Sequence, residues 1–165
     1  MAVKQRLDTP TNNFATLNPL FTNGTETTNA TSSLSLSEGN LKLTADSNYS
    51  LANGTFTMRT GKWYWETYIN TSVNFPMTGI THGTSTAENS YVGYDPNGNV
   101  KGISYSGDGS FYGDSNGDGT HTANNTATGL STYTTGDIIG CFFDADIGSL
   151  KFFKNGTLIR TESGI

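Results

Sequence analysis

Apolar and polar residues alternate over short stretches of this sequence, and the clearest alternation lies in Lys62–Ile69. With a period of two, Trp63 and Trp65 face one side of an extended strand, while Tyr64 and Tyr68 face the other. Because aromatic residues occupy both faces, we expect this strand to be central in a sheet, with the tryptophan face in the core.

The rest of the chain also reads as short strands separated by turns. Gly or Pro interrupts almost every window long enough for a helix, and Asn-Gly and Asp-Gly pairs, which suit tight hairpins, recur throughout. The sequence therefore predicts an all-β fold, either a sandwich or a barrel. The predicted strands are Leu34–Leu36 and Leu41–Leu43 in a hairpin around Glu38–Asn40, Phe56–Met58, Met77–Thr81, Ser90–Tyr94, Gly102–Tyr105, and a meander through Ile138–Phe143, Ser149–Phe153 and Leu158–Ile159.

Two longer segments lack such a pattern. The lead-in before residue 21 is aperiodic, and we expect Phe14, Leu17 and Leu20 to pin it to the core. We therefore divide the chain into an extended lead-in with a polar loop, residues 1–35, and a β-sandwich domain, residues 36–165. Residues 106–136 are mostly Gly, Asp, Asn, Ser and Thr, which predicts a functional loop or a set of long surface turns.

Charge and composition exclude several classes of partner. The net charge of −5 and the pI near 4.8 argue against nucleic acid and against an anionic membrane surface. No window approaches the ~20 apolar residues of a membrane helix, and the first six residues turn polar too early for a secretory signal peptide. The single Cys141 lies in an apolar run, so we expect a small buried side chain.

Two blocks of the sequence, in this order, resemble the SPRY domain family. Gly61–Glu66 is similar to the family's G-K-x-Y-W-E strand, and Gly136–Gly156 resembles its G-D-V-I-G pattern followed by a D-x-D-x-G-x-L-x-F-x-K-N-G hairpin. The resemblance implies a SPRY-like antiparallel β-sandwich of the jelly-roll or lectin-like kind. SPRY domains usually continue for one or two strands past the K-N-G turn, so it also implies that the final strands are missing here. A longer chain or a neighbouring subunit would then supply them.

A narrower resemblance lies upstream of these blocks. Asp8–Leu20, followed by Leu36–Leu41, is similar to the start of SPRY-containing virion proteins of tailed bacteriophages, especially marine ones. It implies a virion structural protein: a tail fibre, a tail appendage or a capsid-surface component, assembled in the cytoplasm of the host bacterium. Its partners would be other virion proteins and copies of itself. The alternative is an adsorption module that recognises a receptor or a glycan on the host surface.

One segment is a candidate for metal binding. Asp114, Asn116 and Asp118 fit the opening of a calcium loop, which places oxygen ligands on one side of a tight turn. An EF-hand would carry a bidentate Glu at the twelfth position, where this chain has Asn125, and would need flanking helices. The EF-hand interpretation therefore fails, which leaves a looser calcium turn or a plain surface loop.

Catalytic residues and cofactor-binding motifs are not evident in the sequence. Asp144 and Asp146 could form a carboxylate pair for acid–base chemistry. The D-x-D-x-G turn already explains their spacing, because Asp side chains in such turns bond nearby backbone amides. No metal-binding His/Cys spacing, nucleophile elbow or phosphate loop is present. We therefore predict a non-enzymatic protein with no catalytic residues and no cofactor.

Binding is expected from loops rather than from strands, since loops on a rigid sandwich usually carry recognition. Six aromatic residues could stack on sugars, but they lie on the most strand-like segments and are predicted to pack in the core. These are Trp63, Trp65, Phe142, Phe143, Phe152 and Phe153. The predicted recognition loops are Asn70–Phe75, Asp95–Asn99 and residues 106–135.

Overall fold

The computed structural model describes residues 14–23, 34–45, 50–72, 75–81, 92–93, 102–113 and 125–165. Within these ranges every regular element is a strand, and every strand pair is antiparallel. The strands are β1 (Leu17–Asn23), β2 (Leu34–Ser37), β3 (Lys42–Ala45), β4 (Leu51–Gly54), β5 (Lys62–Tyr68), β6 (Met77–Thr81), β7 (Gly102–Ser106), β8 (Phe111–Gly113), β9 (Asn125–Ala127), β10 (Ile138–Asp144), β11 (Ser149–Lys154) and β12 (Thr157–Ser163).

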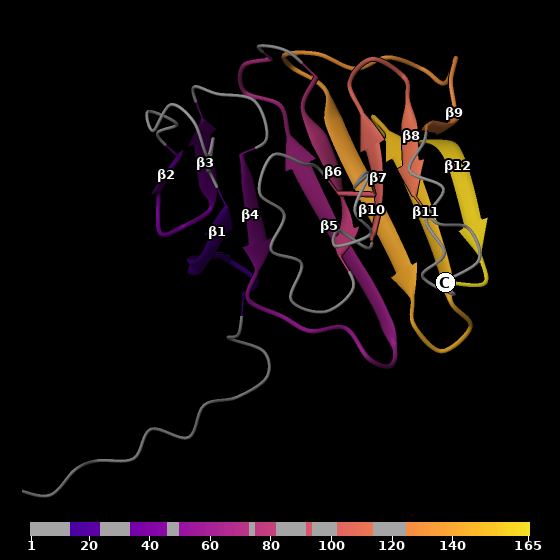
Figure 1. The fold of residues 1–165 in the computed structure, drawn as a ribbon, viewed down its shortest axis with the longest axis horizontal. Coiled ribbons are helices and arrows are strands. Elements are labelled where there is room, and N and C mark those ends of the chain that lie inside the picture. Colours follow the sequence, from indigo (N-terminus) through magenta and orange to yellow (C-terminus); the bar gives the residue numbers. More distant parts are fainter. Residues whose placement is uncertain are drawn as a thin grey trace, which may run out of the picture.

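Two four-stranded sheets form a β-sandwich. One sheet has the order β12-β11-β10-β5 and the other the order β6-β7-β8-β9. They lie over one another, and the remaining strands form two two-stranded sheets, β1-β4 and β2-β3, beside the β5 edge (Figure 1). We call these two small sheets, residues 14–54, the N-terminal lobe. The all-β, SPRY-like sandwich predicted from the sequence is confirmed.

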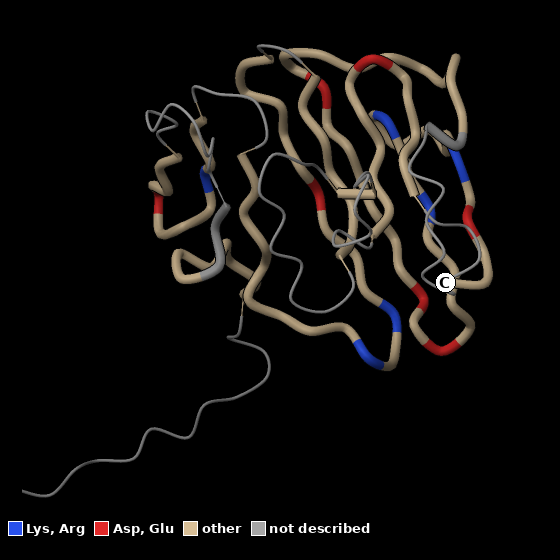
Figure 2. The backbone as a smooth tube through the Cα atoms, in the orientation of Figure 1, with Lys and Arg blue, Asp and Glu red and all other residues tan. Residues whose placement is uncertain are grey.

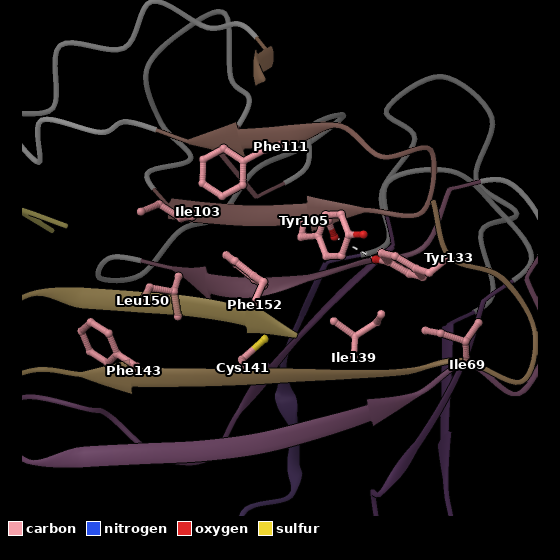
Figure 3. Packing of buried hydrophobic residues seen from close by; sticks show 10 residues of the cluster. All are labelled: Ile69, Ile103, Tyr105, Phe111, Tyr133, Ile139, Cys141, Phe143, Leu150 and Phe152. Atoms are coloured by element: carbon pink, nitrogen blue, oxygen red, sulfur yellow. Dashed lines mark hydrogen bonds between the residues drawn. The ribbon is translucent and has the colours of Figure 1, made fainter. Parts of the chain in front are cut away.

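The core lies between the two large sheets (Figure 3). Phe152 of β11 is fully buried, and its ring centroid lies 5.9 Å from that of Tyr105 on β7 and 5.9 Å from that of Phe111 on β8. These aromatic contacts join one sheet to the other, and aliphatic side chains fill the space around them. The buried cluster comprises Ile69, Ile103, Tyr105, Phe111, Tyr133, Ile139, Cys141, Phe143, Leu150 and Phe152.

The predicted meander β10–β11–β12 is confirmed, including its second turn. Asn155 and Gly156 both have positive φ angles, 49° and 80°, as a tight hairpin requires. The apolar side chains that β10 and β11 bury deeply are the inward ones. Ile138 and Phe142 point away from the core, so the expectation that β10 is covered on both faces is wrong.

The strand predicted over Lys62–Ile69 is present as β5, but its predicted central position is wrong. Among the described strands, β5 pairs with β10 alone and therefore forms one end of its sheet. Trp63 and Trp65 are half-buried and pack against the core cluster, as predicted. The second aromatic set on this strand faces outward instead of into another layer.

Residues 106–136 contribute more to the core than their polar composition suggested. Ser106 and Ser110 are buried in the hairpin between β7 and β8, and Phe111 and Tyr133 belong to the core cluster. The Tyr133 hydroxyl lies within hydrogen-bonding distance of the carbonyl oxygens of Pro76 and Tyr105, at 2.5 and 2.8 Å. Part of this segment is therefore packed structure, because isolated aromatic residues anchor polar backbone to the sandwich.

The N-terminal lobe confirms one prediction and corrects two. The hairpin around Glu38–Asn40 is present as β2 and β3. The strand expected at Phe56–Met58 is absent, and β4 lies just before it at Leu51–Gly54. Phe14 and Leu20 do not reach the core, since 78% and 93% of their surface is exposed. Most of the strand predicted at Ser90–Tyr94 lies outside the described residues.

Candidate interaction surface

Of the candidate catalytic and metal-binding residues, Asp144 and Asp146 are the ones that lie in the described part of the chain. Asp114, Asn116 and Asp118 lie outside the described residues. Within the described ranges, no group of three or more His, Cys, Asp and Glu side chains is placed to hold a metal ion. Asp144 and Asp146 are described, and their contacts show what they do.

Asp144 and Asp146 organise the turn after β10. The carboxylate of Asp146 accepts a 2.8 Å hydrogen bond from the backbone N–H of Gly61, and Asp144 Oδ1 accepts one of 3.2 Å from the Asp146 N–H. Asp144 also lies 3.6 Å from the Lys62 ammonium group. The turn thus ties the start of β5 to the end of β10, which confirms the structural interpretation of the D-x-D-x-G pattern.

A second network closes the opposite end of β10. Asp137 accepts hydrogen bonds from the Thr134 backbone N–H at 2.9 Å and from Asn155 Nδ2 at 2.8 Å, and it lies 3.2 Å from Lys154 Nζ. The Thr134 bond, followed by the Asn155 bond, lowers the pKa of Asp137 below its usual value. Asn155 Oδ1 in turn accepts the Ile138 N–H at 2.9 Å.

The residues of both sequence blocks therefore act as structural ties. Gly61 and Lys62 of the first block meet Asp144 and Asp146 of the second at one end of β10. Asp137 and Asn155, from the two ends of the second block, meet at the other. Polar side chains that are hydrogen-bonded to backbone in this way hold a register and present no reacting group.

Burial raises the pKa values of ionisable groups in the core. Burial raises the pKa of the Cys141 thiol to about 12, despite the opposing effect of a weak hydrogen bond to Thr78. A thiol with that pKa carries almost no thiolate near neutral pH, so it is inert. Burial also raises the pKa of Tyr105 to about 12, and that of Tyr133 further in the same direction. Cys141 is fully buried, as the sequence predicted.

The outer face of the β12-β11-β10-β5 sheet carries several exposed apolar side chains. Register places Tyr64 opposite Phe142, Tyr68 opposite Ile138, and Leu158 opposite Phe153 on this face. Tyr64, Tyr68 and Leu158 are more than half exposed. We call this surface the outer sheet face; it consists of Tyr64, Tyr68, Ile138, Phe142, Phe153 and Leu158.

Local contacts hold the polar groups of the outer sheet face in place. The Tyr64 side chain lies across Gly140, where a Cβ atom would come within 2.7 Å of the tyrosine oxygen. Its hydroxyl donates a 2.7 Å hydrogen bond to Glu66 Oε1, and this bond is the main reason that the pKa of Tyr64 is raised. Lys151 Nζ lies 5.9 Å from the centre of the Phe142 ring, within cation–π range. Aromatic rings with a polar group at one end are typical of protein-binding surfaces.

Sequence reasoning placed recognition in loops and missed this face. Of the predicted loops, Asp95–Asn99 lies outside the described residues, and the part of 106–135 that is described includes buried core. In Asn70–Phe75, the Phe75 side chain is exposed. The signal for the outer sheet face was present in the alternation of Lys62–Ile69, which places Tyr64 and Tyr68 on the face opposite the half-buried tryptophans.

Comparison with known proteins identifies the family. The described residues contain no helical segment with the length and hydrophobicity that crossing a bilayer requires. A comparison with curated proteins gave no match. Residues 62–162 match the family model of the SPRY domain, and SPRY domains are in general protein-binding modules rather than enzymes. Because this match covers more than half of the chain and includes both sequence blocks apart from Gly61, the protein belongs to the SPRY domain family.

Proposed function

We propose that this protein is a non-catalytic binding module in the virion of a tailed bacteriophage. It contacts other virion proteins and copies of itself as part of a tail fibre, a tail appendage or the capsid surface. It is assembled into the particle in the cytoplasm of the host bacterium. The resemblance of Asp8–Leu20 and Leu36–Leu41 to the start of phage virion proteins supports the virion assignment.

The outer sheet face is the observation that carries the binding role. On this face the exposed Tyr64 lies beside Phe142 and the exposed Tyr68 lies beside Ile138. Neighbouring apolar side chains that face solvent in this way are typical of interaction sites. The residues of the two sequence blocks stabilise the fold through hydrogen bonds and ion pairs at both ends of β10. Binding by a rigid sheet face involves little loss of conformational entropy, so a modest contact area gives useful affinity.

The alternative role, adsorption to a host receptor or glycan, is favoured by the same two tyrosines. Tyr64 and Tyr68 expose 58% and 60% of their surface, and each offers an aromatic ring and a hydroxyl group. The two roles differ in what this face touches. A structural role buries it against another virion protein, whereas an adsorption role leaves it free at a distal tip.

The virion assignment is tested by mass spectrometry of purified particles from the phage that encodes the chain. We expect peptides of the chain in particles that remain intact through a density gradient. Their absence would contradict the proposal.

The binding face is tested by particle incorporation of Tyr68→Asp, with Ile147→Asp as the matched control. Ile147 is an exposed aliphatic residue in the turn between β10 and β11, away from the outer sheet face. Tyr68→Asp is expected to reduce incorporation about tenfold or more, because a charge is buried in the contact. Incorporation of the control is expected to stay at the wild-type level. If Tyr68→Asp incorporates normally but host binding is lost, the adsorption role replaces the structural one.

A further inference from the structure

The acidic side chain of Glu66 lies on the exposed face of β5, between Tyr64 and Tyr68. In the described part of the chain, four carboxylates form an ion pair with a lysine or an arginine, and Glu66 is not one of them. Its contact is with the Tyr64 hydroxyl, which donates a 2.7 Å hydrogen bond to Oε1. Among the described residues, Glu66 is therefore an acidic group without a basic partner.

The Tyr64 ring is held beside Glu66 by the neighbouring strand. Register places Gly140 of β10 directly opposite Glu66, and the hydroxyl end of the Tyr64 ring lies across this glycine. A Cβ atom at position 140 would come within 2.7 Å of the tyrosine oxygen and 3.3 Å of two ring carbons, so a larger residue would displace the ring. The residue nevertheless exposes 58% of its surface. Side chains that are already ordered lose little entropy when a ligand binds.

The hydrogen-bonding groups of this pair indicate which ligand fits. The Tyr64 hydroxyl has already donated its hydrogen to Glu66, and a carboxylate accepts hydrogen bonds without donating any. A sugar hydroxyl both donates and accepts, so this pair would satisfy it only in part. A guanidinium group has five N–H donors and no acceptor, and its flat surface stacks on aromatic rings, which the compact ammonium group of lysine does not do. The pair therefore matches an arginine side chain.

The lysines nearest to this pair in the sheet have other partners. Lys62, at the start of β5, lies 3.6 Å from Asp144 and four residues before Glu66 (Figure 2). Lys151 of β11 lies 5.9 Å from the centre of the Phe142 ring, so this sheet face already holds one cation against an aromatic ring. A cation for Glu66 would then come from another molecule. The net charge of −5 favours the approach of a basic partner.

We propose that Tyr64 and Glu66 form a binding site for an arginine side chain of a partner protein. The guanidinium group stacks on the exposed side of the Tyr64 ring and donates hydrogen bonds to the second oxygen of Glu66, Oε2. Tyr68 and Ile138, which lie opposite each other in the register, pack against apolar surface of the same partner. The proposal names the partner chemistry of the outer sheet face, and it rests on the proposed role of that face in binding other proteins.

The test is an NMR titration of the purified full chain with N-acetylarginine methylamide at low salt. This probe is expected to shift the amide signals of Tyr64 and Glu66, and its uncharged citrulline analogue is expected to bind about threefold more weakly or worse. Glu66→Gln keeps an acceptor for the tyrosine hydroxyl but removes the charge, and it is expected to weaken binding of the arginine probe about three- to tenfold. Glu38→Gln removes the same charge from the hairpin of β2 and β3, and it is expected to bind like wild type.

Any of four results would overturn the proposal. The arginine probe might leave these amides unchanged up to ~100 mM, or bind no better than the citrulline probe. Glu66→Gln might bind the arginine probe like wild type, or a methyl glycoside might shift the same amides at lower concentration, which would favour a glycan. A Glu66→Gln chain that fails to fold moves the test to Tyr64→Leu, for which binding about two- to fivefold weaker is expected. None of these results bears on whether the chain is found in virions, so the two proposals fail separately.

Discussion

The sandwich and the N-terminal lobe are built from the same kind of short antiparallel strand, but they use their apolar residues in opposite ways. In the sandwich, the side chains of Phe111 and Phe152 come from different sheets and are buried against each other. In the lobe, Leu20 and Leu41 remain in solvent. Two sheets that face one another exclude water between them, whereas a two-stranded sheet by itself does not form such a layer.

This difference indicates that the sandwich contributes most of the stability of the fold and that the N-terminal lobe contributes less. The family match spans the sandwich, and the motif residues tie both ends of β10 in place. The lobe lies outside that match and carries none of these ties. A binding surface specific to this protein can therefore be built on the lobe without disturbing the shared core.

Native-state hydrogen exchange tests the comparison most directly. Amides in the middle of β10 are expected to exchange only through global unfolding, which slows them about 10⁴-fold or more. Amides of β2 and β3 are expected to be slowed less than about 10²-fold in the monomer, because no buried side chains hold this ladder. Equal protection of the two regions would mean that the lobe shares the core of the sandwich.

Truncation of a core residue should cost far more than the same change in the lobe. Phe152→Ala is expected to lower the free energy of unfolding by about 3–5 kcal/mol, since it leaves a cavity between two buried aromatic rings. Leu41→Ala in the lobe is the matched control, with an expected change below about 0.5 kcal/mol in the monomer. Urea denaturation at low protein concentration measures both, and a costly Leu41→Ala would show that the lobe has a hidden core.

Removal of a single hydroxyl group should destabilise the protein more at a buried tyrosine than at an exposed one. Tyr133→Phe takes away the hydroxyl group that contacts the carbonyl oxygens of Pro76 and Tyr105, and it is expected to cost about 1–3 kcal/mol. Tyr68→Phe removes a hydroxyl from an exposed ring and is expected to cost almost nothing. If Tyr133→Phe lowered the free energy of unfolding as little as Tyr68→Phe does, the Tyr133 hydroxyl would not be essential to the packing of its segment.

Much of the sandwich could be predicted from the sequence because its strands carry local signals. The alternation in Lys62–Ile69, the apolar run of β10 and the Asn155-Gly156 turn each point to one structure without knowledge of the rest. The structural role of Asp144 and Asp146 followed from their spacing alone. These signals arise from neighbours in the chain, which a single sequence displays.

The errors concern features that depend on distant parts of the chain. The edge position of β5 depends on which strands pair with one another. The spacing of apolar residues within one strand does not indicate its pairing partners. Phe14 and Leu20 were expected in the core because they are apolar, but an apolar residue is buried only if a second layer lies opposite it. For the same reason, the outer sheet face became visible only once the layers were known.

The smallest expected effect is the loss of stability at alkaline pH that comes from the buried Cys141 thiol. Its pKa is raised from 9.0 to about 12 by burial, so the unfolded chain loses this proton at a lower pH than the folded chain does. The folded state then binds more protons between these values, and stability is fully present below pH 9 and falls as the pH rises toward 12. By pH 10 the expected loss is about 1 kcal/mol. The buried tyrosines, whose ordinary pKa is 10, begin to add to the loss as the pH approaches 10.

The variant Cys141→Ala separates the thiol from the tyrosines. It is expected to be less stable than wild type at pH 7 because it leaves a small cavity, but to lose less than wild type between pH 8 and 10, because only the tyrosines still contribute to the loss. Denaturant midpoints measured across this range give the two slopes. If both proteins lost stability in parallel, Cys141 would have the same pKa in the folded and unfolded states. Water would then have to reach the centre of β10, and the contrast between a sealed sandwich and an open lobe would no longer hold.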